Sequence, residues 1–175
     1  MLAESQTAVG ISDRQFKRLS AFIEKELGIK MPDTKRVMLE SRLQKRLRAL
    51  RIDTYDEYID RVFSGDDAEL IHMIDVVTTN KTDFFREPDH FEILTKRLLP
   101  KALERDGERG TMSFWSAGCA TGEEPYTLAM VLEEFAVAHR GFDYRIIASD
   151  ISTSALDAAI HAVYDANRDR KSTRL

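Results

Sequence analysis

The sequence has little of what extracellular and membrane proteins usually carry. It contains a single cysteine, Cys119, so the chain cannot build an internal disulfide framework. No apolar run approaches the roughly 18 residues that a membrane-spanning helix requires. Residues 1–10 show no basic segment followed by an apolar core, the pattern of a signal peptide. These absences predict a cytoplasmic protein that does not insert into a membrane.

An excess of positive charge is also lacking. Among 175 residues, 26 are basic and 30 acidic, which gives a formal net charge of −4. Nucleic acid is therefore not expected as a partner, because its binding requires a basic surface. The histidines do not have the spacing of metal ligands, so we predict no metal site. They are read as surface or packing residues: His72, His90, His139 and His161.

The first half of the sequence has the pattern of a helical domain. Apolar residues recur at helical spacing, and the pairs Ser12 with Gln15 and Thr54 with Glu57 are typical of capped helix starts. Gly28 is placed to end the first helix. The helices expected in this half span residues 12–27, 34–51, 54–65, 67–77 and 88–105.

The second half begins after the glycines at 107 and 110 and alternates short apolar runs with helical patterns. Residues 112–117 and 144–149 read as buried strands. Helices are expected at 123–138 and 153–164. This order predicts a right-handed βαβ unit whose two strands are parallel.

The turn between the first strand and its helix, residues 116–126 (SAGCATGEEPY), has features of a ligand site. Small residues allow close approach, and Asp150 ends the next strand, where an acid can accept ribose hydroxyls. The turn is not GxGxxG, and Glu123 with Glu124 would repel phosphate but favour a cationic ligand. This favours S-adenosylmethionine (SAM) over NAD. Alternatively, Gly118 and Gly122 only make a tight turn and the acids only complement the helix dipole.

Four blocks resemble the CheR-type methyltransferases, which methylate glutamate side chains of chemotaxis receptors. They are residues 42–50 (RLQKRLRAL), 79–86 (TNKTDFFR), 114–126 (FWSAGCATGEEPY) and 148–151 (ASDI). The resemblance covers about residues 12–165. It implies a small all-α domain, residues 11–87, and then an incomplete Rossmann-like SAM-dependent methyltransferase domain, residues 88–168, that opens with a linker helix, 88–105. The fold class is α/β.

The resemblance also implies roles for single residues. Asn80, Thr82 and Arg86 match a polar loop over bound SAM, and Arg86 is the predicted catalytic residue. Glu124 matches the contact to the amino acid part of the cofactor, with Glu123 as the neighbouring alternative. The remaining predicted cofactor residues are Gly118 and Asp150. Cys119 is read as a turn-filling residue, not a nucleophile, and Phe84 and Phe85 as packing residues that anchor the loop.

A cationic helix face is the predicted substrate contact. At 100° per residue, the basic side chains lie opposite the leucines at 39, 43, 47 and 50. Such a face suits the acidic cytoplasmic helical domain of a receptor, although a solvated charged face is the ordinary alternative. In the family, this region is thought to meet the receptor. The predicted substrate-binding residues are Arg42, Lys45, Arg46 and Arg48.

The end of the chain departs from the family pattern. Residues 169–175 (DRKSTRL) can be written as the translation of a sequencing adapter, so we expect an artefactual tail on a monomeric fragment with little transferase activity. The predicted function is SAM-dependent methylation of receptor glutamates. The alternatives are a non-catalytic module that binds SAM or a receptor, and a helical domain that acts alone as an interaction module.

Overall fold

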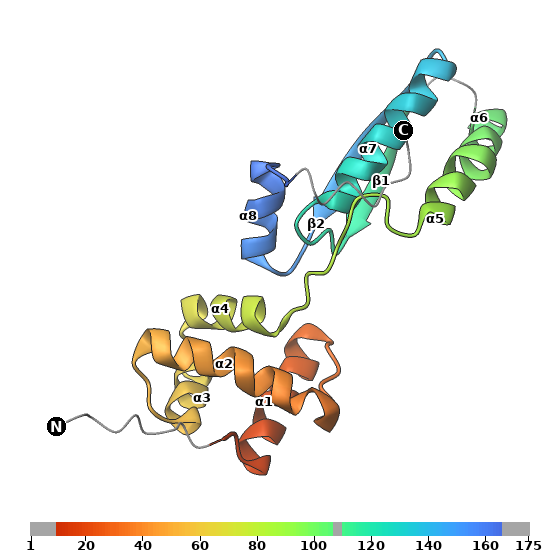
Figure 1. Ribbon diagram of the computed structural model, residues 1–175. Helices are drawn as coiled ribbons and strands as arrows, with labels where there is room; N and C mark the ends of the chain where they lie inside the picture. Colours follow the sequence, from red (N-terminus) through yellow and green to blue (C-terminus); the bar gives the residue numbers. More distant parts are fainter. Residues whose placement is uncertain (1–9, 107–109, 166–175) are drawn as a thin grey trace. The chain divides into compact units, whose positions relative to one another are not determined.

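The computed structural model describes residues 10–106 and 110–165. The chain divides into two compact units, one that ends at Thr78 and one that begins at Thr79 (Figure 1). The boundary predicted after residue 87 is therefore too late. The loop 79–87 belongs to the second unit, because Asn80 bonds to the side chain of Ser152 and Phe85 to that of Thr127. The predicted tail, residues 169–175, lies outside the described residues.

The first unit is helical, as predicted. Three of its helices begin at a side chain that accepts a backbone N–H of the first turn: Ser12 for Gln15, Thr54 for Glu57, and Asp66 for Glu69. The described elements are α1 (Asp13–Leu27), a 3-10 turn η1 (Asp33–Lys35), α2 (Arg36–Leu50), α3 (Tyr55–Phe63) and α4 (Asp67–Val77).

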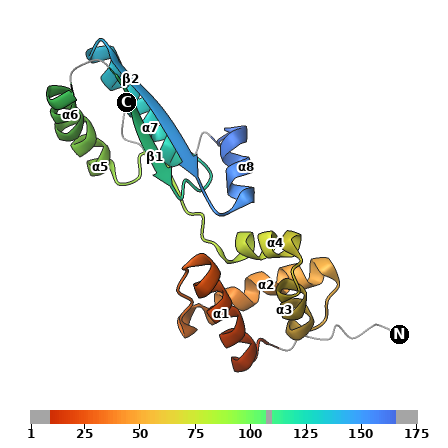
Figure 2. The same cartoon turned by 180° about the vertical axis from the view of Figure 1, so that it is seen from behind.

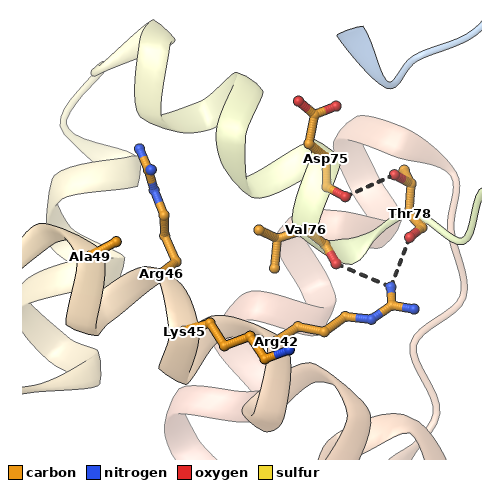
Figure 3. A pocket seen from close by; sticks show the side chains of 7 residues that line it. All are labelled: Arg42, Lys45, Arg46, Ala49, Asp75, Val76 and Thr78. Atoms are coloured by element: carbon orange, nitrogen blue, oxygen red, sulfur yellow. Dashed lines mark hydrogen bonds between the residues drawn. The ribbon is translucent and has the colours of Figure 1, made fainter. Parts of the chain in front are cut away.

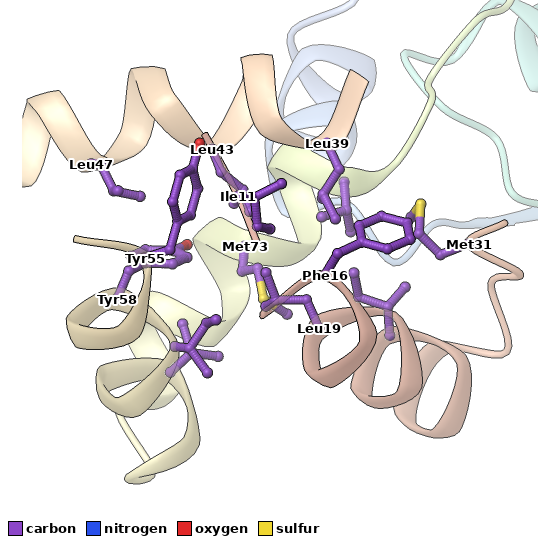
Figure 4. Close-up of a cluster of buried hydrophobic side chains, with 14 of the residues drawn as sticks. Ile11, Phe16, Leu19, Met31, Leu39, Leu43, Leu47, Tyr55, Tyr58 and Met73 are labelled. Atoms are coloured by element: carbon purple, nitrogen blue, oxygen red, sulfur yellow. The ribbon is translucent and has the colours of Figure 1, made fainter. Parts of the chain in front are cut away.

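One apolar core joins the four α-helices of this unit. Leu39, Leu43 and Leu47, four residues apart on α2, are buried on the same side of that helix. They meet side chains of the other three helices, as Figure 4 shows. The labelled members are Ile11, Phe16, Leu19, Met31, Leu39, Leu43, Leu47, Tyr55, Tyr58 and Met73.

The second unit contains the predicted strand–helix–strand order. Its described elements are α5 (Pro88–Ile93), η2 (Leu94–Leu98), α6 (Leu99–Asp106), β1 (Gly110–Ala117), α7 (Glu123–Ala138), β2 (Phe142–Ser149) and α8 (Thr153–His161). The expected helix 88–105 is interrupted by η2, which has π-helical hydrogen bonding. Each strand begins two residues earlier than predicted, and α8 ends at His161 instead of residue 164.

The two strands are parallel, with Gly110 opposite Phe142 and Ala117 opposite Ser149. Both strands therefore end at the same level, and the turns that follow them meet there. The helix α7 covers one face of the pair, behind the strands in Figure 2 and in front of them in Figure 1, and Leu132 of α7 is fully buried there. On the opposite face, Trp115 is 70% exposed.

Candidate functional site

The turn after β1 is fastened to the end of β2. The backbone N–H groups of Gly118 and Cys119 both donate to the carbonyl of Ser149, at 2.8 and 3.0 Å. The carboxylate of Asp150 accepts the N–H of Ala120 on one oxygen and that of Ser152 on the other, each at 2.8 Å. Ala120 has a φ of 47°, in the left-handed region that few non-glycine residues adopt. The Asp150 carboxylate therefore stabilises the shape of the turn.

Asp150 is thus placed at the carboxyl edge of the strands, as predicted. Its two oxygens retain further lone pairs beyond the two backbone contacts, because an ionised carboxylate can accept about four hydrogen bonds. It can therefore hold the turn and still accept ligand hydroxyls. From the side of α8, Tyr164 also fixes the turn, since its hydroxyl donates to the Thr121 carbonyl at 2.8 Å.

The two acids at the start of α7 have different surroundings. Glu123 is fully buried, and its Oε2 accepts the hydroxyl of Thr121 at 2.6 Å. Glu124 lines a cavity, and its Oε1 accepts the buried hydroxyl of Ser116 at 2.7 Å. Of the two alternatives, only Glu124 is presented to the cavity, with Ser116 fixing one of its oxygens.

This cavity has a volume of about 560 Å³, within the usual range for small-molecule sites. Four of the predicted site residues line it: Thr82, Arg86, Gly118 and Glu124. They come from the loop 79–87, the turn after β1 and the start of α7. The structure therefore brings together residues that lie more than thirty positions apart in the sequence.

The cavity wall carries charges of both signs. Lys81 and Arg86 contribute cations, and Asp83, Glu87 and Glu124 contribute carboxylates. The Arg86 guanidinium donates to the carbonyl of Lys81 at 2.8 Å and, within the described residues, forms no ion pair with Asp83 or Glu87. Such a wall suits a ligand with both an ammonium and a carboxylate group.

Asn80 is placed differently from the other predicted loop residues. Its amide nitrogen donates to the hydroxyl of Ser152 at 3.0 Å, and Ser152 caps the start of α8. The ring of Phe84 packs edge-on against Tyr164, with centroids 4.9 Å apart, in agreement with its predicted packing role. Asn80 and Phe84 therefore tie the loop to the α8 side of the unit.

Several residues at this site were not predicted from the sequence. His90, read there as a surface or packing residue, lines the cavity together with Thr127. Ser116 and Ser152 orient Glu124 and Asn80. Only Thr127 carries a sequence signal, because it follows Glu124 by three residues and so lies on a similar side of α7.

Cys119 is buried in the turn. Burial raises the pKa of its thiol, and the carboxylates of Asp150 and Glu124 raise it further. A thiol held neutral in this way is a poor nucleophile. The structure thus agrees with a space-filling role for Cys119.

The predicted cationic face of α2 divides into two parts. Figure 3 draws three of its residues, Arg42, Lys45 and Arg46. The Arg42 guanidinium donates to the carbonyls of Val76, Val77 and Thr78 at the end of α4, at 3.1, 3.3 and 2.7 Å. Helix ends leave such carbonyls without partners. Arg42 of α2 therefore caps the C-terminal end of α4, and this contact explains its position by the packing of α2 against α4.

Arg46 forms a bidentate pair with Glu69 of α4, at 2.9 and 2.7 Å. The Glu69 side chain is 1% exposed. Burial raises the pKa of its carboxyl, but the Arg46 guanidinium, the Tyr58 hydroxyl and the charge of Arg61 together outweigh burial, so the pKa lies below its ordinary value. Of the four predicted substrate-binding residues, Arg42 and Arg46 thus contact α4, and Lys45 and Arg48 are exposed.

Within residues 10–106 and 110–165, no helix combines the length and apolar character needed to cross a membrane. Within the same residues, no group of three or more histidine, cysteine or acidic side chains is arranged to hold a metal ion.

Family comparisons agree with this division of the chain. The family model described as "CheR methyltransferase, all-alpha domain" matches residues 14–78, and that described as "CheR methyltransferase, SAM binding domain" matches residues 80–172. The two matches meet at the boundary between the two structural units. The second extends into the terminal segment that was expected to be artefactual. The cofactor of the matched domain is S-adenosyl-L-methionine.

Curated relatives include proteins described as "Chemotaxis protein methyltransferase". That of Borreliella burgdorferi is 37% identical over 91% of this chain and 58% of its own length. Those of Salmonella typhimurium and Escherichia coli are each 36% identical over 94% of this chain, and over 54% and 55% of their own lengths. The chain thus spans little more than half of these relatives. With an all-α domain followed by a SAM-binding domain, it belongs to the CheR methyltransferase family.

Proposed function

We propose that this chain binds SAM in the 560 Å³ cavity and forms part of an enzyme that methylates glutamate side chains of chemotaxis receptors. The observation that carries the proposal is that Glu124 and Arg86 line the same cavity, Glu124 from the start of α7 and Arg86 from the loop 79–87. An α-amino acid group needs a carboxylate for its ammonium and a cation for its carboxylate. Glu124 and Arg86 supply this pair.

Two more predicted residues support the proposal, Gly118 from the cavity wall and Asp150 from outside that wall. Asp150 lies at the carboxyl edge of the strands, where an acid can accept the ribose hydroxyls. Gly118 leaves open space, since no atom lies within 4 Å of the point where a Cβ would be. SAM has no phosphate, which suits a turn followed by two acids.

When bound, SAM supplies a methyl group on a positively charged sulfur. A glutamate carboxylate is already ionised at neutral pH, with a reference pKa near 4.3, so no general base is needed. The chain's own residues then have to position the partners and exclude water. Arg86 and Thr82 on the loop, opposite Glu124, are suited to that task.

We propose that the receptor's cytoplasmic helical domain is the substrate and that Lys45 and Arg48 contact it. Both side chains are exposed on α2, whereas Arg42 and Arg46 are occupied by α4. Exposed cations favour association with an acidic helical surface. The relatives' description as chemotaxis protein methyltransferases supports this choice of substrate.

Calorimetric titration of SAM tests the cofactor proposal. We expect Glu124→Gln to weaken binding about tenfold, because a charge-assisted contact contributes roughly 1.5–3 kcal/mol. Glu134→Gln, an exposed acid on the same helix, serves as the matched control and should leave the affinity unchanged. Absence of SAM binding by the wild-type chain, or equal loss in both variants, would contradict the proposal.

A further inference from the structure

The loop 79–87 adopts a backbone that it does not favour by itself. Phe85 and Glu87 have φ values of 52° and 54°. Non-glycine residues rarely adopt this left-handed region, and they do so mainly where the surrounding structure holds them. Arg86 stands between these two residues, so its approach to the cavity depends on whatever holds the loop in this shape.

Thr127 on α7 provides such a contact. Its side chain is fully buried, and its hydroxyl accepts the backbone N–H of Phe85 at 3.1 Å. The same hydroxyl donates to the carbonyl of Glu123 at 2.6 Å. A hydroxyl has one proton to donate, and giving it to Glu123 leaves the oxygen lone pairs for Phe85. Thr127 also lines the cavity beside Glu124.

We propose that Thr127 is a positioning residue for the cofactor loop, which it latches to α7 through Phe85 so that Thr82 and Arg86 face Glu124. This inference rests on the proposed SAM site. Thr127 bonds to the backbone of the residue just before Arg86, and its helix begins with Glu123 and Glu124. One buried hydroxyl thus connects the two walls of the cavity.

The competing explanation is that Thr127 is an ordinary helix threonine bonded to its own helix. Thr95 offers the comparison, because its hydroxyl donates to the carbonyl of Phe91, also four residues earlier, at 3.0 Å. Thr95 is not part of the cavity wall described above. Replacing each threonine with the isosteric valine removes the same local bond, and only the change at Thr127 also removes the latch to Phe85.

The experiment compares Thr127→Val, Thr127→Ser and Thr95→Val in the full chain. SAM affinity is measured by calorimetry, and exchange of the Phe85 amide hydrogen by NMR. We expect Thr127→Val to weaken SAM binding and speed Phe85 exchange, each by about tenfold. Thr127→Ser keeps the hydroxyl and should stay within about twofold of the wild type, as should Thr95→Val.

Unchanged affinity and exchange in Thr127→Val would overturn the latch but leave the SAM site intact. If the wild type binds no SAM, the proposed function fails. In that case the exchange rate of the Phe85 amide hydrogen still tests whether Thr127 holds the loop. An unchanged rate in Thr127→Val would overturn the latch as well. Should valine disturb folding, Thr127→Ala removes the hydroxyl without placing a methyl group in its position, and the same comparison with Thr127→Ser applies.

Discussion

The two units differ in how much of their apolar surface they bury within themselves. Among the described residues, the core of the first unit joins fifteen buried side chains, and only Val37, Phe63 and Ile71 are large, apolar and more than a third exposed. The main cluster of the second unit joins four buried side chains, while ten large apolar residues are exposed, including Trp115 and Ile147.

This difference indicates that different interactions stabilise the first unit and the candidate site of the second. Apolar burial contributes roughly 25 cal/mol per Å², so a closed core stabilises the first unit directly. In the second unit, the residues of the candidate site are held by polar contacts to the backbone, such as those of Asp150 and Thr127. We therefore expect core substitutions to dominate the stability of the first unit and polar substitutions to dominate ligand binding in the second.

The largest expected effect is that of Leu39→Ala. The Leu39 side chain is fully buried, and its truncation should lower the free energy of unfolding of the first unit by about 2–5 kcal/mol. Val37→Ala, on the same helix but 77% exposed, and Ile147→Ala should each cost less than about 0.5 kcal/mol. Urea unfolding followed by circular dichroism measures all three. Similar losses of unfolding free energy in all three variants would contradict the proposed difference between the units.

Next in size is Glu69→Gln, which leaves Arg46 without its buried carboxylate. We expect a loss of about 2–4 kcal/mol in the free energy of unfolding at pH 7, because breaking a buried pair leaves an uncompensated charge. Glu92→Gln breaks the exposed pair with Lys96 and should cost under about 0.5 kcal/mol. Equal effects would mean that Glu69 is not buried in solution.

The same pair has a defined pH dependence. The pKa of Glu69 is lower in the folded than in the unfolded chain, so its stabilisation is fully present above the unfolded-state pKa. It is lost as the pH falls through the lower, folded-state pKa. The difference between wild type and Glu69→Gln should therefore be constant from neutral pH to about pH 5 and shrink below about pH 4. A difference that grows on acidification would contradict this assignment.

The smallest expected effect separates the two parts of the cationic face. Arg42→Met removes the cap on three carbonyls of α4 and should cost about 1–2 kcal/mol of unfolding free energy. Arg48→Met should change the free energy of unfolding by less than about 0.5 kcal/mol. In a full-length enzyme, the same substitution should lower the transfer of labelled methyl groups to receptor-containing membranes. The proposed receptor contact of Arg48 would be excluded if Arg48→Met left methyl transfer unchanged and Arg42→Met lowered it only as far as it lowered stability.

Much of the fold could be predicted from local sequence. Helix starts are encoded by caps such as Ser12 and Thr54, and α7 has the predicted bounds. The π-helical turn at Leu94–Leu98 has no such signal. The strand starts were predicted too late because Gly110 and Phe142 are strand residues only through their pairing with each other.

The site was predictable in composition but not in orientation. Sequence spacing identified the turn and Asp150, because both follow strands that end at one edge. It could not separate Glu123 from Glu124, since neighbouring positions at a helix start differ only in the direction of their side chains. It also could not predict the pairing of Arg46 with Glu69, which lie 23 residues apart and meet only when α2 packs against α4.

The contact of Tyr164 with the turn limits which residues can stand there. A Cβ at Gly122 would lie 2.6 Å from the Tyr164 hydroxyl and 2.9 Å from the Cβ of Ala159, whereas Gly118 has no atom within 4 Å of that point. Within the chain itself, Gly118 is therefore restricted only by its φ of 80°, which asparagine can also adopt, and the space beside it is the space proposed for the cofactor. Gly122 has no room for even a methyl group. Two glycines that look alike in the sequence thus differ in what excludes a side chain: the proposed ligand at Gly118, and the protein itself, through Ala159 of α8 and Tyr164, at Gly122.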